Sequence, residues 1–243
     1  MNKQYLNKKT KEAWDLHAGR WKKDIKKIKF FNRKELEERN NYLFKIIHSL
    51  KGKKKILDAG CGFGANAVYA ALLGHKVIGL DFSEKNLHLA KEYAKINGVK
   101  LALIKSDVRS MPFKNKSFDV IISGGVIEHF PETEKAIKEH ARVLKKGGLF
   151  VGHVPQRVTI FVLSKLFLKS IGKWSIGYEK SFSTGKFKRY LEDSGFKLIK
   201  VKRLEIKPGI RSPLYGEILR LLDKPLWLLG FGGAHFAFLA IKK

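Results

Sequence analysis

The fold is decided by residues 56–64, which read ILDAGCGFG. An apolar strand runs here into a glycine-rich turn, and the turn opens a helix. Gly60, Gly62 and Gly64 permit positive φ angles and let a ligand approach the backbone, because no Cβ stands in the way. Open α/β sheets bind ligands at the carboxyl edge of their strands, and this turn lies at that edge. The stretch therefore predicts a ligand site.

Beyond this turn, strands alternate with helices, which is typical of a mostly parallel sheet with helices on both faces. We expect strands near residues 54–59, 76–80, 101–105, 118–123 and 149–154, and helices near 64–74, 84–97 and 132–145. Asn97-Gly98 and Gly147-Gly148 are helix-stop signals. A helix near 183–194 and strands near 196–202 and 234–241 complete a Rossmann-like α/β fold.

The flanking segments predict additions to this fold. Residues 1–52 set Trp14, Trp21 and other apolar residues among lysines at roughly helical spacing, which predicts an N-terminal helical cap. We expect residues 53–243 to form the main domain, with a lid-like insertion at about 155–182 where an apolar segment interrupts the alternation. Residues 214–229 predict an amphipathic helix broken at Pro225.

Two acidic residues follow the next two strands. Asp81 comes 21 residues after Gly60, where a carboxylate can accept hydrogen bonds from both ribose hydroxyls of an adenosine cofactor. Asp107 follows the strand near 101–105, and we expect its carboxylate to accept a hydrogen bond from the adenine amino group. Val108 and Phe82 would be apolar walls for the adenine ring. These strand-end acids and the glycine turn together predict a site for an adenosyl cofactor.

Five motifs stand in order over about 100 residues: ILDAGCGFG, VIGLDFS, SDVRSMPF, FDVIISGGVIEHF and ARVLKKGGLFVGHVP. In these motifs the chain resembles the class I S-adenosylmethionine (SAM) dependent methyltransferases, in particular the small-molecule branch typified by ubiquinone and menaquinone biosynthesis methyltransferases. The resemblance implies a seven-stranded sheet with an antiparallel last strand and SAM across its carboxyl edge. It also implies that Gly60, Gly62 and Gly64 line the methionine portion, that Asp81 binds ribose and Asp107 adenine, and that Ser123, Gly124 and Gly125 lie beside the reacting methyl.

Several of these residues have a structural alternative. Asp58 either contacts the cofactor amino group or fixes the loop by accepting backbone N–H bonds, and Phe82 is either an adenine wall or core. We expect Cys61 to be a small packed residue of the cofactor loop, because no basic partner adjoins it. His129 is the candidate general base, although a role in the fold carries more weight. No histidine pair has zinc-site spacing, so we expect no metal.

The net charge of +28 is concentrated in the flanks: residues 1–55 contribute +12, residues 56–153 +4 and residues 154–243 +12. Such basic flanks favour an anionic substrate, nucleic acid or an anionic membrane surface. General lysine enrichment is the alternative, because Lys outnumbers Arg 40 to 10. With a single cysteine and no apolar signal segment behind the first residues, we expect a cytoplasmic protein with peripheral contact at the membrane.

The leading hypothesis is a SAM-dependent methyltransferase for O- or C-methylation of a small-molecule or lipid-linked acceptor, with the apolar insertion and tail at an interface. Ser123-Gly124-Gly125-Val126 is not the Asn/Asp-Pro-Pro-aromatic run of enzymes that methylate amino groups of bases. An RNA-directed or other nucleic-acid methyltransferase or binding module and a non-catalytic SAM-binding protein are the alternatives. The glycine turn and Asp81 also permit an NAD-dependent oxidoreductase, against which Asp107 argues.

Overall fold

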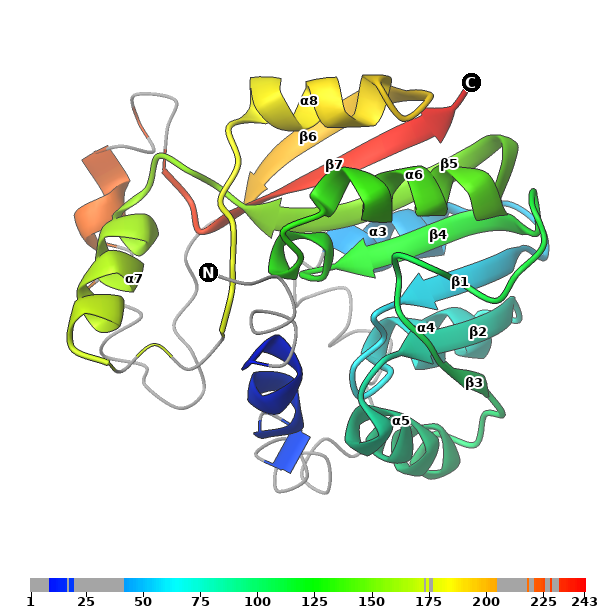
Figure 1. The fold of residues 1–243 in the computed structure, drawn as a ribbon. Coiled ribbons are helices and arrows are strands. Elements are labelled where there is room, and N and C mark those ends of the chain that lie inside the picture. Colours follow the sequence, from blue (N-terminus) through cyan, green and yellow to red (C-terminus); the bar gives the residue numbers. More distant parts are fainter. Residues whose placement is uncertain are drawn as a thin grey trace.

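The computed structural model describes residues 9–16, 18–19, 42–172, 174, 177–204, 218, 221–225, 228 and 232–243. Seven strands form one sheet in the order β3-β2-β1-β4-β5-β7-β6 (Figure 1). They are β1 (Lys55–Ala59), β2 (Lys76–Asp81), β3 (Ala102–Lys105), β4 (Phe118–Gly124), β5 (Leu144–Pro155), β6 (Phe196–Leu204) and β7 (His235–Lys242). Strands β1 to β5 pair in parallel, and β7 is antiparallel to both its neighbours. The predicted Rossmann-like sheet is confirmed.

Helices cover both faces of the sheet (Figure 1). The helices are α3 (Tyr42–Ser49), α4 (Ala65–Leu72), α5 (Glu84–Ile96), η1 (Ile127–His129), α6 (Thr133–Val143), α7 (Ile160–Ser170) and α8 (Thr184–Glu192). Of these, α7 lies at one end of the molecule and not over the sheet (Figure 1). On one face, α6 and α8 pack in a cluster with Leu57 and Ile121. On the other, α3 and α4 pack with Ile56 and Ile122. Because consecutive strand residues point to opposite faces, the continuous apolar runs of β1 and β4 fill both layers.

The junction between α6 and β5 differs from its prediction. The helix expected over 132–145 ends at Val143, and the strand expected over 149–154 begins at Leu144. Leu144 pairs with Phe118 of β4 and is buried, so strand pairing starts as soon as the helix ends. Gly147-Gly148, which we interpreted as a helix stop, therefore lies inside β5. The other predicted elements between residues 54 and 204, and the last strand, agree with the structure to within two residues at each end.

The N-terminal cap and the C-terminal tail are described only in part. Residues 9–16 and 18–19 are helical, and we call them the N-terminal helical segment; Trp21 lies outside the described residues. The insertion contains α7. Of the helix expected over 214–229, residues 218, 221–225 and 228 are described and are helical. The division into a cap and a main domain at residue 52 stays a prediction.

None of the described helices has both the length and the apolar character needed to cross a membrane.

Candidate active site

A cavity of about 150 Å³ lies at the carboxyl edge of the sheet, where β1, β2 and β4 end. Its walls come from the turns after these three strands and from the N-terminal helical segment. They are formed by Trp14, Gly60, Cys61, Gly62, Phe63, Ala65, Asn66, Asp81, Phe82, Asn86, Gly124, Gly125, Val126, His129 and Phe130. Eight predicted site residues are therefore brought together here: Gly60, Cys61, Gly62, Asp81, Phe82, Gly124, Gly125 and His129. The predicted residues Asp58, Gly64, Asp107, Val108 and Ser123 lie outside these walls.

The three glycines of the turn have three different surroundings. Gly60 has a φ of 76°, and a Cβ built there would come within 2.5 Å of the Val126 side chain. Gly64, with a φ of 85°, lies against Ala90 of α5, where a built Cβ would come within 3.1 Å. Gly62 has a φ of 54° and donates its N–H to Asp81. Gly60 and Gly64 are thus required by protein packing as well as by backbone conformation.

Asp81 ends β2 and connects the glycine turn to α5. Its Oδ2 accepts the Gly62 N–H at 2.9 Å, and its Oδ1 accepts the Ser83 N–H at 2.8 Å and the Asn86 side-chain amide at 3.3 Å. Burial raises the pKa of Asp81 despite these bonds. A carboxylate offers about four acceptor positions, so Asp81 keeps capacity for a further donor on the cavity side. Its placement fits a ribose hydroxyl.

Asp58 and Cys61 are both buried, and the surroundings of each indicate a structural role. Asp58 accepts the N–H of Ala67, in the first turn of α4, at 3.1 Å. Burial, opposed by this backbone bond, raises the pKa of Asp58 to about 7. The Cys61 sulfur lies 3.1 Å from a Cβ built at Gly79, and burial raises the pKa of its thiol well above the usual range. Such a thiol is a poor nucleophile.

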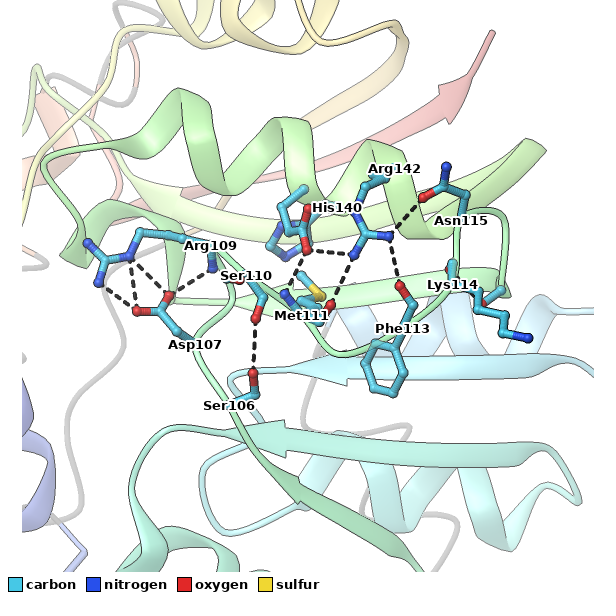
Figure 2. Close-up of polar contacts among 12 residues, drawn as sticks. Ser106, Asp107, Arg109, Ser110, Met111, Phe113, Lys114, Asn115, His140 and Arg142 are labelled. Atoms are coloured by element: carbon cyan, nitrogen blue, oxygen red, sulfur yellow. Dashed lines mark hydrogen bonds and ion pairs between the residues drawn. The ribbon is translucent and has the colours of Figure 1, made fainter.

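Asp107 is held by a neighbouring guanidinium rather than facing the cavity. Arg109 Nη2 lies 2.6 Å from Asp107 Oδ2, and Arg109 Nε lies 3.0 Å from Oδ1 (Figure 2). Burial raises the pKa of Asp107, but the bonds from Arg109 outweigh it and lower the pKa below its ordinary value. Arg109 also bonds Glu132 at 2.9 Å and stacks over the ring of Phe130. Val108 packs in the core. The adenine contacts of both residues stay predictions.

The loop after β3 is fixed to α6 by one arginine that sequence reasoning missed. Arg142 donates to the carbonyl oxygens of Phe113 at 2.7 Å and Met111 at 3.0 Å, and to Asn115 Oδ1 at 2.8 Å (Figure 2). Glu139 holds the guanidinium at 2.7 Å and accepts the Met111 N–H at 2.6 Å. This fork positions the segment that carries Asp107. The sequence shows Arg142 only as a cation in a helix, and gives no sign of its carbonyl partners.

His153 of β5 lies directly behind Gly124 and Gly125, which are on the cavity wall. A Cβ built at Gly124 would lie 3.0 Å from His153 Nε2, and one built at Gly125 would lie 3.2 Å from His153 Cε1. Burial lowers the pKa of His153 to about 4, so its ring is neutral at neutral pH. Ser123 is fully buried on β4, and its hydroxyl has no hydrogen-bond partner within the described residues. Ser123 therefore lies beneath the cavity rather than on its wall.

His129 and Glu128 stand together on η1. His129 Nδ1 lies 2.9 Å from the carbonyl oxygen of Tyr178 and must donate its proton there, so Nε2 is the basic nitrogen of the neutral ring. Nε2 lies 3.9 Å from Glu128 Oε1. Burial raises the pKa of Glu128 well above its ordinary range, and its Oε2 has no partner within the described part of the chain. Sequence analysis missed Glu128, because burial cannot be inferred from its position beside His129.

The N-terminal helical segment lies across the cavity and connects its two sides. Trp14 contacts the His129 ring edge-on at 5.1 Å, and Ser83 donates to Asp15 at 2.5 Å. Ala18 packs with α5. A second cavity of about 640 Å³, which shares no wall residue with the first, lies between this segment and α5. Trp14 of the predicted N-terminal cap is therefore on the cavity wall, whereas α7, which lies in the predicted lid-like insertion, contributes nothing to that wall.

Comparisons with known proteins agree with this geometry. The Methyltransferase domain family model matches residues 57–152. A ubiquinone biosynthesis O-methyltransferase of Pelagibacter ubique is 35% identical over 134 residues, 54% of this chain and 55% of the relative. A demethylmenaquinone methyltransferase of Staphylococcus haemolyticus is 32% identical over 183 residues, 66% of this chain and 75% of the relative. A solved SAM-dependent methyltransferase of Methanosarcina mazei is 20% identical, with a TM-score of 0.61 over 81% of this chain and 96% of that one.

These similarities differ in what they show. The chain spans 55% of the Pelagibacter relative but 75% of the staphylococcal one. The match to the solved structure bears on the fold alone. The family model covers the glycine turn, Asp81, Gly124, Gly125 and η1, which form most of the cavity wall, whereas Trp14 of that wall lies outside the matched residues. The chain belongs to the class I SAM-dependent methyltransferases.

Proposed function

We propose that the protein transfers a methyl group from SAM to an oxygen or carbon atom of a small-molecule or lipid-linked acceptor. The observation that carries the proposal is the cavity wall shared by Asp81 and the Gly60–Gly62 turn, since a buried carboxylate beside a backbone turn suits an adenosyl cofactor. The names of both curated relatives support a small-molecule acceptor.

The cavity residues would divide the work of holding the cofactor. Asp81 is expected to accept hydrogen bonds from the ribose, and the turn at Gly62 to leave room for the methionine portion. Trp14 and Phe130 would exclude water from the same space. When bound, SAM supplies a methyl group on a sulfonium whose leaving group departs neutral, so little acid catalysis is needed at sulfur. Orientation of the two reactants would then provide most of the rate.

Proton removal from the acceptor is assigned to the η1 side of the cavity. We place the general base at His129 Nε2, because Nδ1 is committed to the Tyr178 carbonyl oxygen. Glu128 is not on the cavity wall; it is buried beside His129 and, neutral through burial, would keep its own proton rather than take the acceptor's. We therefore assign the acceptor's proton to His129 alone.

A melting experiment tests cofactor use. S-adenosylhomocysteine, the demethylated product, should raise the melting temperature of the wild-type chain, as a ligand specific for the native state must. The Asp81→Ala chain should fold but lose this shift. A shift with NAD and none with S-adenosylhomocysteine would contradict the proposal.

The acceptor class is tested with labelled SAM. Methyl-labelled SAM is incubated with a lysate divided into lipids, metabolites, RNA and proteins, and label is expected in the lipid or metabolite fraction. Label in RNA instead would reassign the acceptor to nucleic acid. We also propose that the protein is cytoplasmic and contacts the membrane peripherally, in line with its basic flanks.

A further inference from the structure

Helix α7 buries one of its two lysines and exposes three of its large apolar side chains. Leu163, Leu166 and Phe167 are 60%, 55% and 63% exposed, and they share one side of the helix because they are three and four residues apart. Lys165 points inward, is 5% exposed, and donates to Glu179 at 2.9 Å and to Ser181 at 2.7 Å. A surface helix of a globular domain normally has the opposite arrangement. The exposed apolar side of α7 is therefore a built feature.

A C-terminal helical piece next to α7 also exposes large apolar side chains. Leu221 and Leu222 are 55% and 56% exposed. Asp223, the next residue along the chain, is buried. It accepts the N–H of Ile160 at the start of α7 and the N–H of Gly233, and so ties this piece to α7. Figure 1 shows α7 and this piece next to one another at one end of the molecule. We call Leu163, Leu166, Phe167, Leu221 and Leu222 the interfacial face.

The charges around the interfacial face are basic. Residues 157–178 contain four Lys or Arg and no Asp or Glu, and one of the four, Lys165, is buried in its ion pair with Glu179. Of the described residues in these two segments, Arg157, Lys169 and Lys224 are exposed cations, and Asp223 is a buried acid. Association of two copies through this face would bring these cations of the two chains together, and each chain already has a net charge of +28. An anionic surface with an apolar interior meets both the charges and the leucines.

We propose that the interfacial face docks on an anionic phospholipid membrane, with α7 lying in the plane of the interface. Ring contacts connect the docked helix to the part of the cavity wall formed by Gly124 and Gly125. Phe161 of α7 lies 6.0 Å from the ring of His235, which lies 5.3 Å from His153 beneath Gly125. The proposal deepens the proposed function by naming the partner surface of a lipid-linked acceptor, and docking itself does not depend on methyl transfer.

Vesicle flotation tests the docking. Wild-type protein is mixed with phosphatidylcholine vesicles that contain phosphatidylglycerol, and with vesicles of phosphatidylcholine alone. We expect binding to the anionic vesicles that weakens with added salt. The Leu166→Ser/Phe167→Ser chain should bind the anionic vesicles at least about tenfold more weakly than wild type, because two inserted side chains are lost. A matched control, Leu72→Ser/Ile199→Ser, changes residues that are 46% and 52% exposed on α4 and β6 and should bind as wild type.

Several outcomes would overturn the docking proposal: no flotation of the wild type, equal binding to neutral vesicles, or equal loss in both double variants. A wild type that sediments as a dimer, with Leu166→Ser/Phe167→Ser monomeric and flotation unaffected, would make the face a contact between copies instead. The melting shift with S-adenosylhomocysteine is measured on the same three proteins. A normal shift without flotation defeats docking alone, whereas flotation without a shift defeats only the proposed function.

Discussion

Asp81 Oδ2 accepts the backbone N–H of Gly62 at 2.9 Å, so the acid at the end of β2 also sets the conformation of the turn after β1. We predict that Asp81→Asn weakens S-adenosylhomocysteine binding about ten- to hundredfold, because charge-assisted hydrogen bonds are lost. Isothermal titration calorimetry measures this change. Asp119→Asn, which removes an acid that pairs with Lys145 on the surface, should leave the affinity unchanged. Wild-type affinity in both Asp81→Asn and Gly62→Val would refute the assignment of this edge.

Gly60 offers a prediction on stability. Its φ of 76° and the approach of Val126 to 2.5 Å of a built Cβ indicate that Gly60→Ala lowers the free energy of unfolding by about 2 to 4 kcal/mol. Gly74 has a φ of 84° but open space around a built Cβ, so Gly74→Ala should cost only about 1 kcal/mol of backbone strain. Denaturant titration measures both variants. Adding Val126→Ala to Gly60→Ala should restore part of the loss, and an equal cost for both glycines would contradict the packing argument.

The sequence predicted the sheet edge well, because its signals there are local. A glycine turn after an apolar strand has few other conformations, and Asp81 follows a strand whose neighbours in the sheet can be counted along the chain. What could not be predicted is which residues that are distant in sequence contact one another in the folded chain. The expectation that Gly60 faces a ligand took no account of Val126, which is 66 residues further along and reaches Gly60 only in the folded chain.

Asp107 shows the same limit. Its position after β3 is given by strand alternation, but it is bound by Arg109, which Glu132 and Phe130 hold in turn, through a loop whose path the sequence does not specify. The junction of α6 and β5 was misplaced for a related reason. Helix-stop glycines are a local signal, whereas the pairing of Leu144 with Phe118 is a long-range contact that ended the helix earlier.

Arg142 leads to a prediction on dynamics. Its fork holds the carbonyl oxygens of Met111 and Phe113, a geometry that a lysine ammonium cannot reproduce. We expect Arg142→Lys to increase hydrogen exchange in residues 106–116 and to lower stability by about 2 kcal/mol. Hydrogen-exchange mass spectrometry measures the loop directly. Arg189→Lys, an exposed exchange on α8, serves as the matched control. Unchanged exchange in the loop would show that other contacts hold it.

Buried histidines predict loss of stability in acid. Burial lowers the pKa of His140 and His153 to about 4 and that of His235 to about 3, against an ordinary value of 6.5. Below pH 6.5 these histidines therefore bind more protons in the unfolded chain than in the folded one, and their contribution to stability falls as the pH falls toward these lower values. Each histidine contributes up to about 3 kcal/mol to that loss. Unfolding titrations from pH 7 to about pH 4 measure the slope.

His140→Gln should reduce this slope by about one proton, since His140 is fully buried on α6. The exposed His88 on α5 provides the control, and the slope of stability against pH should be the same in His88→Gln as in wild type. Equal slopes in wild type and His140→Gln would show that His140 takes up no proton on unfolding.

Glu128 gives the prediction that separates a neutral acid from an ionised one. Burial raises its pKa well above the ordinary value of 4.5, so above that pH the unfolded chain loses a proton that the folded chain keeps, and stability falls as the pH rises. Glu128→Gln retains the shape without the ionisation, and its stability relative to wild type should therefore increase with pH. If Glu128 were ionised in the folded chain, the relative stability of Glu128→Gln would instead be constant at neutral pH. Comparison of the two chains at pH 5 and pH 8 decides between these states, and an unchanged melting shift with S-adenosylhomocysteine in Glu128→Gln would show that Glu128 takes no part in binding the cofactor.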